Sequence, residues 1–241
     1  MPKSKFEQIF RNLKSNIENE TYPLSSMLPS ENELAAAYSC SRNTIRRATA
    51  KLIELGYVQP SQGKGVHVIY HPILQNEFTI GGIESFQESA KRNKKSTFTK
   101  VIRLEKILAT PSIAKRSGFP LNTPLYDLRR VRYVEGKPLI LDLNLFLQSA
   151  VPNLTKEIAE SSVYEYLEDT LGMTIVTSRR RLTVEHATEQ DEALLDLGDY
   201  NCLAVITSQT YNSDGIQFEY TQSRHQPDYF CFNDTAIRKK P

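Results

Sequence analysis

The stretch LPSENELAAAYSCSRNTIRRATAKLIELGY, residues 28–57, predicts two short helices separated by a tight turn. The first helix begins at a capping box, because the Ser30 hydroxyl can accept from the Glu33 amide while the Glu33 carboxylate reaches back. Ser41 is placed to cap the second helix. Apolar residues of the second helix recur at helical spacing, namely Ile45, Ala48, Leu52 and Leu55. This arrangement is typical of a helix-turn-helix.

The start of the second helix is basic. If the apolar stripe faces inward, the residues that lie mainly outward are Arg42, Asn43, Thr44, Arg46 and Arg47. The free amides and dipole at this helix end suit a phosphate, and an arginine there can reach a guanine edge in the major groove. An isolated basic helix is more often a solvated surface, so the flanking sequence has to decide between the two interpretations.

The flanking sequence completes a known module. Residues 5–20 predict an amphipathic helix, and residues 57–59 and 66–68 alternate as short strands around PSQGKG, residues 60–65. The two glycines permit a tight hairpin tip. A helix-turn-helix followed by such a hairpin is a winged helix, whose tip can approach a minor groove or phosphates. A nucleotide-binding P-loop is excluded, because Val66 follows the GKG run and a strand comes next instead of a helix.

Residues 5–69 closely resemble the DNA-binding domain of the GntR family. The resemblance lies in LPSENELA (28–35), SRNTIRRA (41–48), LGY (55–57) and GKG (63–65). It implies that domain 1–69 is a winged helix-turn-helix that binds double-stranded operator DNA. The predicted DNA contacts are Ser30, Asn32, Ser41, Arg42, Asn43, Thr44, Arg46, Arg47, Gln62, Gly63, Lys64 and Gly65. Asn32 departs from the family, because many relatives carry an arginine there that touches DNA.

The rest of the chain is larger and nearly neutral. Residues 1–70 have 9 Lys and Arg against 6 Asp and Glu, whereas residues 71–241 have 21 against 22. Residues 70–80 show no clear period and are expected to be a linker. Beyond them, alternation predicts strands at 98–108, 125–134, 138–146, 175–184, 203–211 and 216–220, with helices at 111–117, 162–171 and 188–197. Hairpin-joined strands with inserted helices indicate an antiparallel α+β domain over residues 81–241.

Two arginines of one predicted strand are candidate anion ligands. Arg130 and Arg132 share a strand face at a separation of about 7 Å, and paired guanidinium groups suit a phosphate. Salt bridging to a carboxylate on the neighbouring strand is the more common arrangement for such a pair. Ser162, at the start of a predicted helix, adds a hydroxyl beside free amides. The run of residues 179–181, RRR, alternates across a strand and is expected to be a solvated or salt-bridged surface.

Residues 80–238 resemble the UTRA effector domain, whose fold is similar to chorismate lyase and which defines the HutC subfamily. The stretches LTKEI (154–158), SVYEYLE (162–168), LLDL (194–197) and FEYTQSRH (218–225) look especially like repressors of trehalose operons. This resemblance implies trehalose 6-phosphate as the effector. It implies a pocket made by Ser85, Phe86, Arg130, Arg132, Asp142, Ser162, Tyr164, Glu219 and His225, with Arg130, Arg132 and Ser162 at the phosphate. Related aminosugar-phosphate sensors carry Glu and Tyr in place of Asp142 and His225, which argues against an aminosugar ligand.

The sequence therefore predicts a homodimeric, cytoplasmic repressor that leaves its operator when a sugar phosphate binds. No enzyme activity, metal or cofactor is expected, because the four histidines form no metal spacing and neither GxSxG nor GxGxxG occurs. No apolar run approaches the ~20 residues of a membrane helix. Two alternatives stay open. One is a sensor of another phosphosugar, such as a glucosamine or glucose phosphate, and the other is a chorismate-lyase-like enzyme tethered to a DNA-binding domain.

Overall fold

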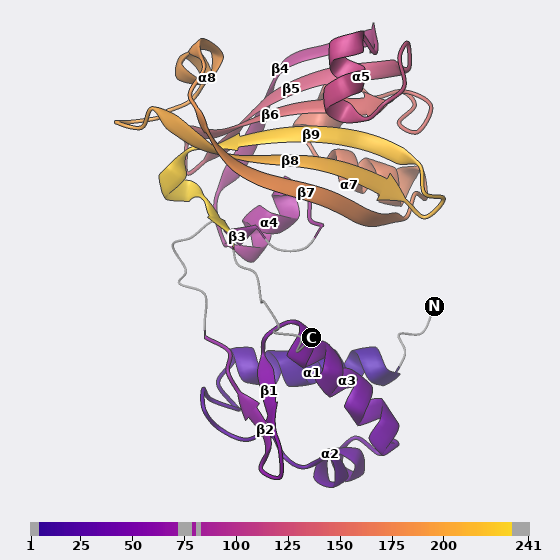
Figure 1. Ribbon diagram of the computed structural model, residues 1–241, viewed down its shortest axis with the longest axis vertical. Coiled ribbons are helices and arrows are strands. Elements are labelled where there is room, and N and C mark those ends of the chain that lie inside the picture. Colours follow the sequence, from indigo (N-terminus) through magenta and orange to yellow (C-terminus); the bar gives the residue numbers. More distant parts are fainter. Residues whose placement is uncertain (1–4, 72–78, 81–82, 233–241) are drawn as a thin grey trace. The chain divides into compact units, whose positions relative to one another are not determined.

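The computed structural model describes residues 5–71, 79–80 and 83–232. These residues form two compact units, of which the first contains residues 5–71 and the second residues 79–232 (Figure 1). Each unit has its own hydrophobic core. No helix among the described residues has the length and apolar character needed to cross a membrane.

The first unit has the predicted winged-helix elements. They are α1 (Lys5–Glu18), α2 (Glu31–Ala37), α3 (Arg42–Glu54), β1 (Val58–Ser61) and β2 (Gly65–Val68). Both predicted caps are confirmed, because the Ser30 hydroxyl accepts from the Glu33 amide at 3.3 Å and the Ser41 hydroxyl accepts from the Thr44 amide at 3.2 Å. Of the predicted apolar stripe, Ile45, Ala48 and Leu52 are buried against α1 and the hairpin. Leu55, at the C-cap of α3, is 44% exposed, so the stripe ends one turn earlier than predicted. The sequence therefore fixes this unit through local signals.

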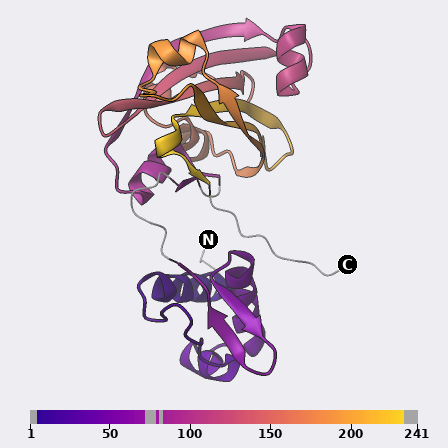
Figure 2. The same ribbon diagram turned by 60° about the vertical axis from the view of Figure 1, so that its left-hand side comes forward.

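The hairpin that follows α3 is shaped by glycines. Strands β1 and β2 are antiparallel and lie beside the helices (Figure 2). Gly63, at the tip, has a φ of +72° with no atom within 4 Å of the place a side chain would occupy. Gly65 has a φ of +112°, and a Cβ there would lie 2.5 Å from Met27 Cε. The tip is therefore an open turn that presents backbone to the surroundings.

The second unit is built on a six-stranded antiparallel sheet. Its strand order is β4 (Thr97–Leu108), β5 (Pro124–Val134), β6 (Lys137–Leu147), β9 (Gln217–His225), β8 (Cys202–Asn212) and β7 (Ile175–His186). Helices α5 (Pro111–Ser117) and α8 (Glu189–Leu194) cover one face. Helices α4 (Phe86–Arg92), α6 (Lys156–Glu160) and α7 (Val163–Glu165) lie on the other face (Figure 1). Apolar side chains pack between the sheet and both helical layers.

Several elements of this unit differ from the sequence prediction. Helices α4 and α6, of seven and five residues, were not predicted. The predicted helix 162–171 is a single α-helical turn, α7, that continues as a π-helical turn over Tyr166–Thr170. The last two residues of the predicted linker form β3 (Thr79–Ile80), which pairs in parallel with β10 (Cys231–Phe232). Residues 72–78 of that linker lie outside the described residues.

The largest difference concerns β9, which was predicted to end at Tyr220 and extends to His225. Its final residues, TQSRH, are polar on both faces, so they lack the alternation that marks a half-buried strand. On one face, Ser223 and His225 line a cavity. On the other, buried Arg224 donates to Asp191 of α8 at 2.8 and 2.9 Å and to Glu185 of β7 at 2.8 Å. Contacts with residues distant in the chain thus stabilise the end of β9, and these contacts leave no apolar pattern in the sequence.

Candidate functional site

The first candidate site is the exposed surface formed by α2, α3 and the hairpin tip. All twelve predicted DNA contacts lie on these elements or at their caps. Eleven of them are exposed, and Thr44 is half-buried. The Thr44 hydroxyl lies 2.9 Å from the Ser41 hydroxyl at the start of α3. The surface therefore combines a helix start, three arginines and an exposed glycine turn, which is the chemistry that phosphates and base edges require.

Glu31, the first residue of α2, bridges two of these arginines. Its carboxylate accepts from Arg42 Nη2 at 3.1 Å and from Arg46 Nε at 3.0 Å. The pKa of Glu31 is lowered, mainly by its hydrogen bond with Arg46 and further by its interaction with Arg42. Arg47 points elsewhere, because its guanidinium lies 4.7 Å from the centre of the Phe6 ring in α1. The sequence did not single out Glu31, whose partners are 11 and 15 residues away.

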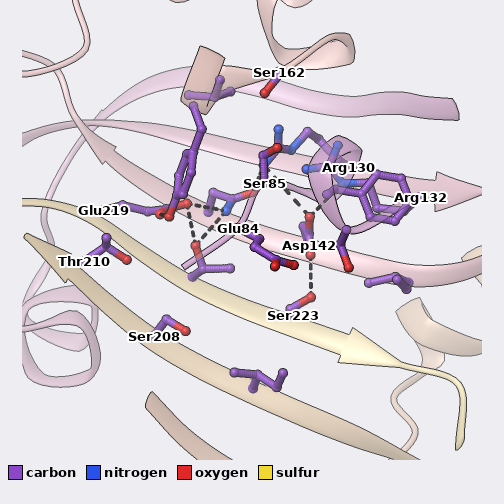
Figure 3. Close-up of a pocket in the computed structure, with 18 of the residues that line it drawn as sticks. Glu84, Ser85, Arg130, Arg132, Asp142, Ser162, Ser208, Thr210, Glu219 and Ser223 are labelled. Atoms are coloured by element: carbon purple, nitrogen blue, oxygen red, sulfur yellow. Dashed lines mark hydrogen bonds and ion pairs between the residues drawn. The ribbon is translucent and has the colours of Figure 1, made fainter. Parts of the chain in front are cut away.

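The second candidate site is a cavity of about 980 Å³, counting its open mouth, between the sheet and the layer of α4 and α7. All nine predicted effector residues line it: Ser85, Phe86, Arg130, Arg132, Asp142, Ser162, Tyr164, Glu219 and His225. Figure 3 shows the two arginines on one side and Ser208 and Thr210 on the other, with Asp142 and Ser223 between them. The charged and hydroxyl groups of the lining suit a small polar ligand.

The sequence left two interpretations of the arginine pair open, a salt bridge to the neighbouring strand and an anion site. In the structure the pair contacts a carboxylate of that strand and also lines the cavity. Arg132 Nε donates to Asp142 on the neighbouring strand at 2.8 Å, and its guanidinium lies 4.8 Å from the centre of the Phe86 ring. Arg130 lies 3.9 Å from the same carboxylate and donates to Asn144 at 2.9 Å. Burial and the charge of Arg132 lower the pKa of Arg130 to about 9. One carboxylate thus contacts two buried cations, and the charge of Glu219 also acts on Arg130.

A chain of hydrogen bonds extends from Asp142 toward the end of β9. The Ser223 hydroxyl donates to Asp142 at 2.6 Å and lies 2.9 Å from His225 Nε2. Because the serine hydrogen is directed at the carboxylate, Nε2 carries the imidazole proton and donates to Ser223. Burial lowers the pKa of His225 to about 4, so the ring is neutral. Against the cost of burial, the charges of Arg132 and Arg130 keep the pKa of Asp142 below its ordinary value.

A second network surrounds Glu219. Its carboxylate accepts from Tyr164 at 2.7 Å, from Asn144 at 3.0 Å and from Thr221 at 2.7 Å. A shift of register between β8 and β9 lies directly before Glu219 in β9, and Phe218, the residue skipped there, packs edge-on against the Tyr164 ring. Such a bulge can direct two successive side chains to one face. Glu219 therefore enters the cavity already held by three donors.

The predicted serines are helix caps as well as cavity residues. The hydroxyl of Ser85 accepts from the Glu88 amide at 3.2 Å, and that of Ser162 accepts from the Glu165 amide at 3.3 Å. Each hydroxyl keeps its own hydrogen, which can be donated to an anion.

Several cavity residues were missed by the sequence reasoning: Glu84, Asn144, Ser178, Arg180, Ser208, Thr210, Thr221 and Ser223. The RRR run, expected to be solvated or salt-bridged, is exposed at Arg179 and Arg181, whereas half-buried Arg180 lines the cavity, which the sequence did not predict. The available signal was polar residues spaced two apart on successive strands, as in Ser208 and Thr210. That spacing also describes a solvent-facing strand, so the sequence could not decide.

Comparison with known proteins identifies the two units. Residues 5–68 match the family "Bacterial regulatory proteins, gntR family", and residues 92–231 match the UTRA domain. This chain belongs to the GntR family and carries a UTRA domain. A regulator of this family acts on transcription, which agrees with the separate surface and cavity described above.

This GntR-family regulator is similar over its whole length to a characterised relative. It is 36% identical over 240 residues to the HTH-type transcriptional regulator TreR of Bacillus subtilis (strain 168), covering 100% of both chains. The solved effector-binding domain of the B. subtilis trehalose repressor is 36% identical, covers 59% of this chain and 99% of that domain, and has a TM-score of 0.54. The possible transcriptional regulator YydK of B. subtilis is 25% identical, covers 97% and 100%, and has a TM-score of 0.79.

Proposed function

We propose that this regulator represses a trehalose-utilisation operon as a homodimer and leaves its operator when trehalose 6-phosphate binds the cavity. The observation that carries the proposal is the buried pair Arg130 and Arg132, which share one carboxylate at 2.8 and 3.9 Å. A phosphate group can accept from both guanidinium groups, and arginines can donate to it in bidentate fashion. The similarity to a trehalose repressor supports the choice of sugar.

The remaining cavity groups suit the sugar part of such a ligand. Glu219 and Asp142 are acceptors for ring hydroxyls, and the Ser85 and Ser162 hydroxyls can donate to the phosphate. The proposed function does not require any bond of the ligand to be broken. Binding alone, with differential affinity for two arrangements of the dimer, is sufficient for regulation.

Helix α4 gives the effector a route to the DNA-binding unit. The segment 84–89 supplies five lining residues, and in the chain it directly follows β3 and the residues that connect the two units. A ligand that contacts this segment therefore acts on residues that neighbour, in the chain, those that connect the two units. Switching a 99:1 population to 1:99 requires about 5.5 kcal/mol of differential binding. In a homodimer, two winged helices must reach half-sites about one helical turn apart, so a changed spacing weakens operator binding.

The proposal is tested by fluorescence anisotropy on a labelled duplex of the regulator's own promoter at fixed, stated salt. The full-length protein is titrated with trehalose 6-phosphate, glucose 6-phosphate, glucosamine 6-phosphate and trehalose. Trehalose 6-phosphate is expected to release the DNA at the lowest concentration, and trehalose is expected to have no effect. Release by an aminosugar phosphate alone would contradict the choice of effector.

Arg130→Ala combined with Arg132→Ala is expected to abolish release while leaving operator affinity within about twofold. Arg129→Ala is the matched control, since Arg129 directly precedes Arg130 in the chain and is directed to the opposite face of β5. Loss of DNA binding in the double variant would show that the pair is needed for folding. Turnover of chorismate or of a sugar phosphate by the wild type would favour the enzyme alternative.

A further inference from the structure

A third arginine lies across the cavity from the pair on β5. Arg180 is on the edge strand β7, where it is the partner of Ser208 on β8. Ser208 is in turn the partner of Thr221 on β9, and Thr221 of Asn144 on β6. These four side chains all line the cavity, so they form one row across its floor. Because neighbouring strands lie about 4.8 Å apart, roughly 19 Å of sheet separates β5 from β7.

The floor between the arginines is lined with hydroxyl groups. Thr221 and Ser208 belong to the row of Arg180, and the adjacent row contains Ser178 and Thr210, whose hydroxyls lie 3.3 Å apart. Hydroxyls both donate and accept, as the hydroxyls of a sugar do. A hexose whose phosphate lies at the β5 side covers only the nearer strands. The floor toward β7 therefore offers polar contacts to a part of the ligand beyond the first ring.

Arg180 is directed into this region by strand alternation. Among residues 178–181, Ser178 and Arg180 line the cavity, whereas Arg179 and Arg181 are exposed. Burial and the charge of Glu219 raise the pKa of Tyr164 well above its ordinary value, and the positive charge of Arg180 acts in the opposite direction. Tyr164, whose hydroxyl donates to Glu219 at 2.7 Å, and Arg180 line the same cavity, and Arg180 comes from β7, at the opposite end of this sheet face from the β5 pair.

We infer that Arg180 binds the second ring of a phosphorylated disaccharide and is the residue by which the cavity distinguishes it from a phosphorylated monosaccharide. This inference rests on the proposed function, since it takes the phosphate to lie at Arg130 and Arg132. A hydrogen bond from a guanidinium to a sugar hydroxyl in a half-enclosed site contributes about ten- to a hundredfold in affinity. A ligand without the second ring does not gain this factor.

Isothermal titration calorimetry on the full-length regulator without DNA tests the inference. Trehalose 6-phosphate and glucose 6-phosphate are titrated into the wild type, Arg180→Ala and Arg180→Lys. Arg180→Ala is expected to weaken trehalose 6-phosphate about ten- to a hundredfold and to leave glucose 6-phosphate within about twofold. Arg180→Lys, which keeps the charge on a shorter donor, is expected to recover part of the loss. Arg179→Ala and Arg181→Ala remove the same charge from the same strand and are expected to change neither ligand.

Each outcome separates this inference from the proposed function. If the wild type binds neither sugar phosphate, the proposed function fails and the inference fails with it. If the wild type binds trehalose 6-phosphate and Arg180→Ala weakens both ligands equally, or neither, the proposed function stands and the role of Arg180 is refuted. Thermal unfolding of each variant checks that the second unit is folded, and a partial recovery in Arg180→Lys excludes a loss caused by misfolding alone.

Discussion

The variant Glu31→Gln tests whether Glu31 orients two arginines of α3 for sequence-specific contact with DNA. Glu31 holds Arg42 and Arg46, which are four residues apart on α3, with donor–acceptor distances of 3.1 and 3.0 Å. The two like charges repel each other at this spacing, and the carboxylate between them fixes both side chains. We expect Glu31 to act as a positioning residue that orients the arginines toward base edges. We also expect its negative charge to weaken their binding to the phosphates of non-specific DNA.

The magnitude follows from the exposure of these pairs. The side chains of Glu31, Arg42 and Arg46 are 37%, 57% and 58% exposed. Exposed ion pairs contribute about 0.2–1 kcal/mol each, so the variant should bind non-specific DNA more tightly by up to about 2 kcal/mol, or roughly thirtyfold. Loss of orientation in one arginine removes about 1–3 kcal/mol of base discrimination. The ratio of operator to non-specific affinity should therefore fall about tenfold or more.

The assay is fluorescence anisotropy with the operator duplex and a scrambled duplex of equal length, each measured over a series of salt concentrations. Non-specific binding of Glu31→Gln should show a steeper salt dependence, by about 0.9 for each additional phosphate neutralised. Glu54→Gln, at the exposed C-terminal end of α3, removes the same charge and is expected to leave the ratio unchanged. An unchanged ratio in Glu31→Gln, or an equal change in Glu54→Gln, would refute the positioning role.

Three further predictions concern stability. Asp191→Asn should destabilise the second unit by about 3–5 kcal/mol in urea unfolding, because it leaves buried Arg224 without its main partner, whereas exposed Asp196→Asn should change it by less than about 1 kcal/mol. Burial lowers the pKa of His225 to about 4 in the folded state, so only the unfolded chain takes up this proton as the pH falls below about 6.5. Wild type should therefore lose about 2 kcal/mol more than His225→Gln between pH 7 and 5, and an equal loss would contradict the assignment of a neutral ring. Ser30→Ala should lower the stability of the first unit by about 1 kcal/mol and Ser30→Gly by only a few tenths; equal thermal shifts for both would show that the cap is not what matters.

The sequence predicted the sites unevenly. Arg130 and Arg132 could be placed on one strand face because they are two residues apart in a predicted strand whose partner strand is apolar at most positions. Arg180 could not be distinguished from Arg179 and Arg181, since alternation tells which residues share a face and not whether that face meets solvent or a cavity. The missed end of β9 has the same cause, because polar cavity residues and buried ion pairs both remove the apolar pattern.

What the sequence determined by itself are the features whose partners lie within a few residues. The Ser30 and Ser41 caps and the glycine turn at Gly63 depend only on neighbours in the chain, and the apolar stripe of α3 is visible from its spacing even though it stabilises the helix only once it is buried. The tertiary structure decided which distant polar groups meet: Glu31 with two arginines of α3, and residues of five strands around one cavity. Such long-range contacts depend on strand order and register, which are set by burial over the whole unit. They therefore cannot be predicted from the pattern of any single segment.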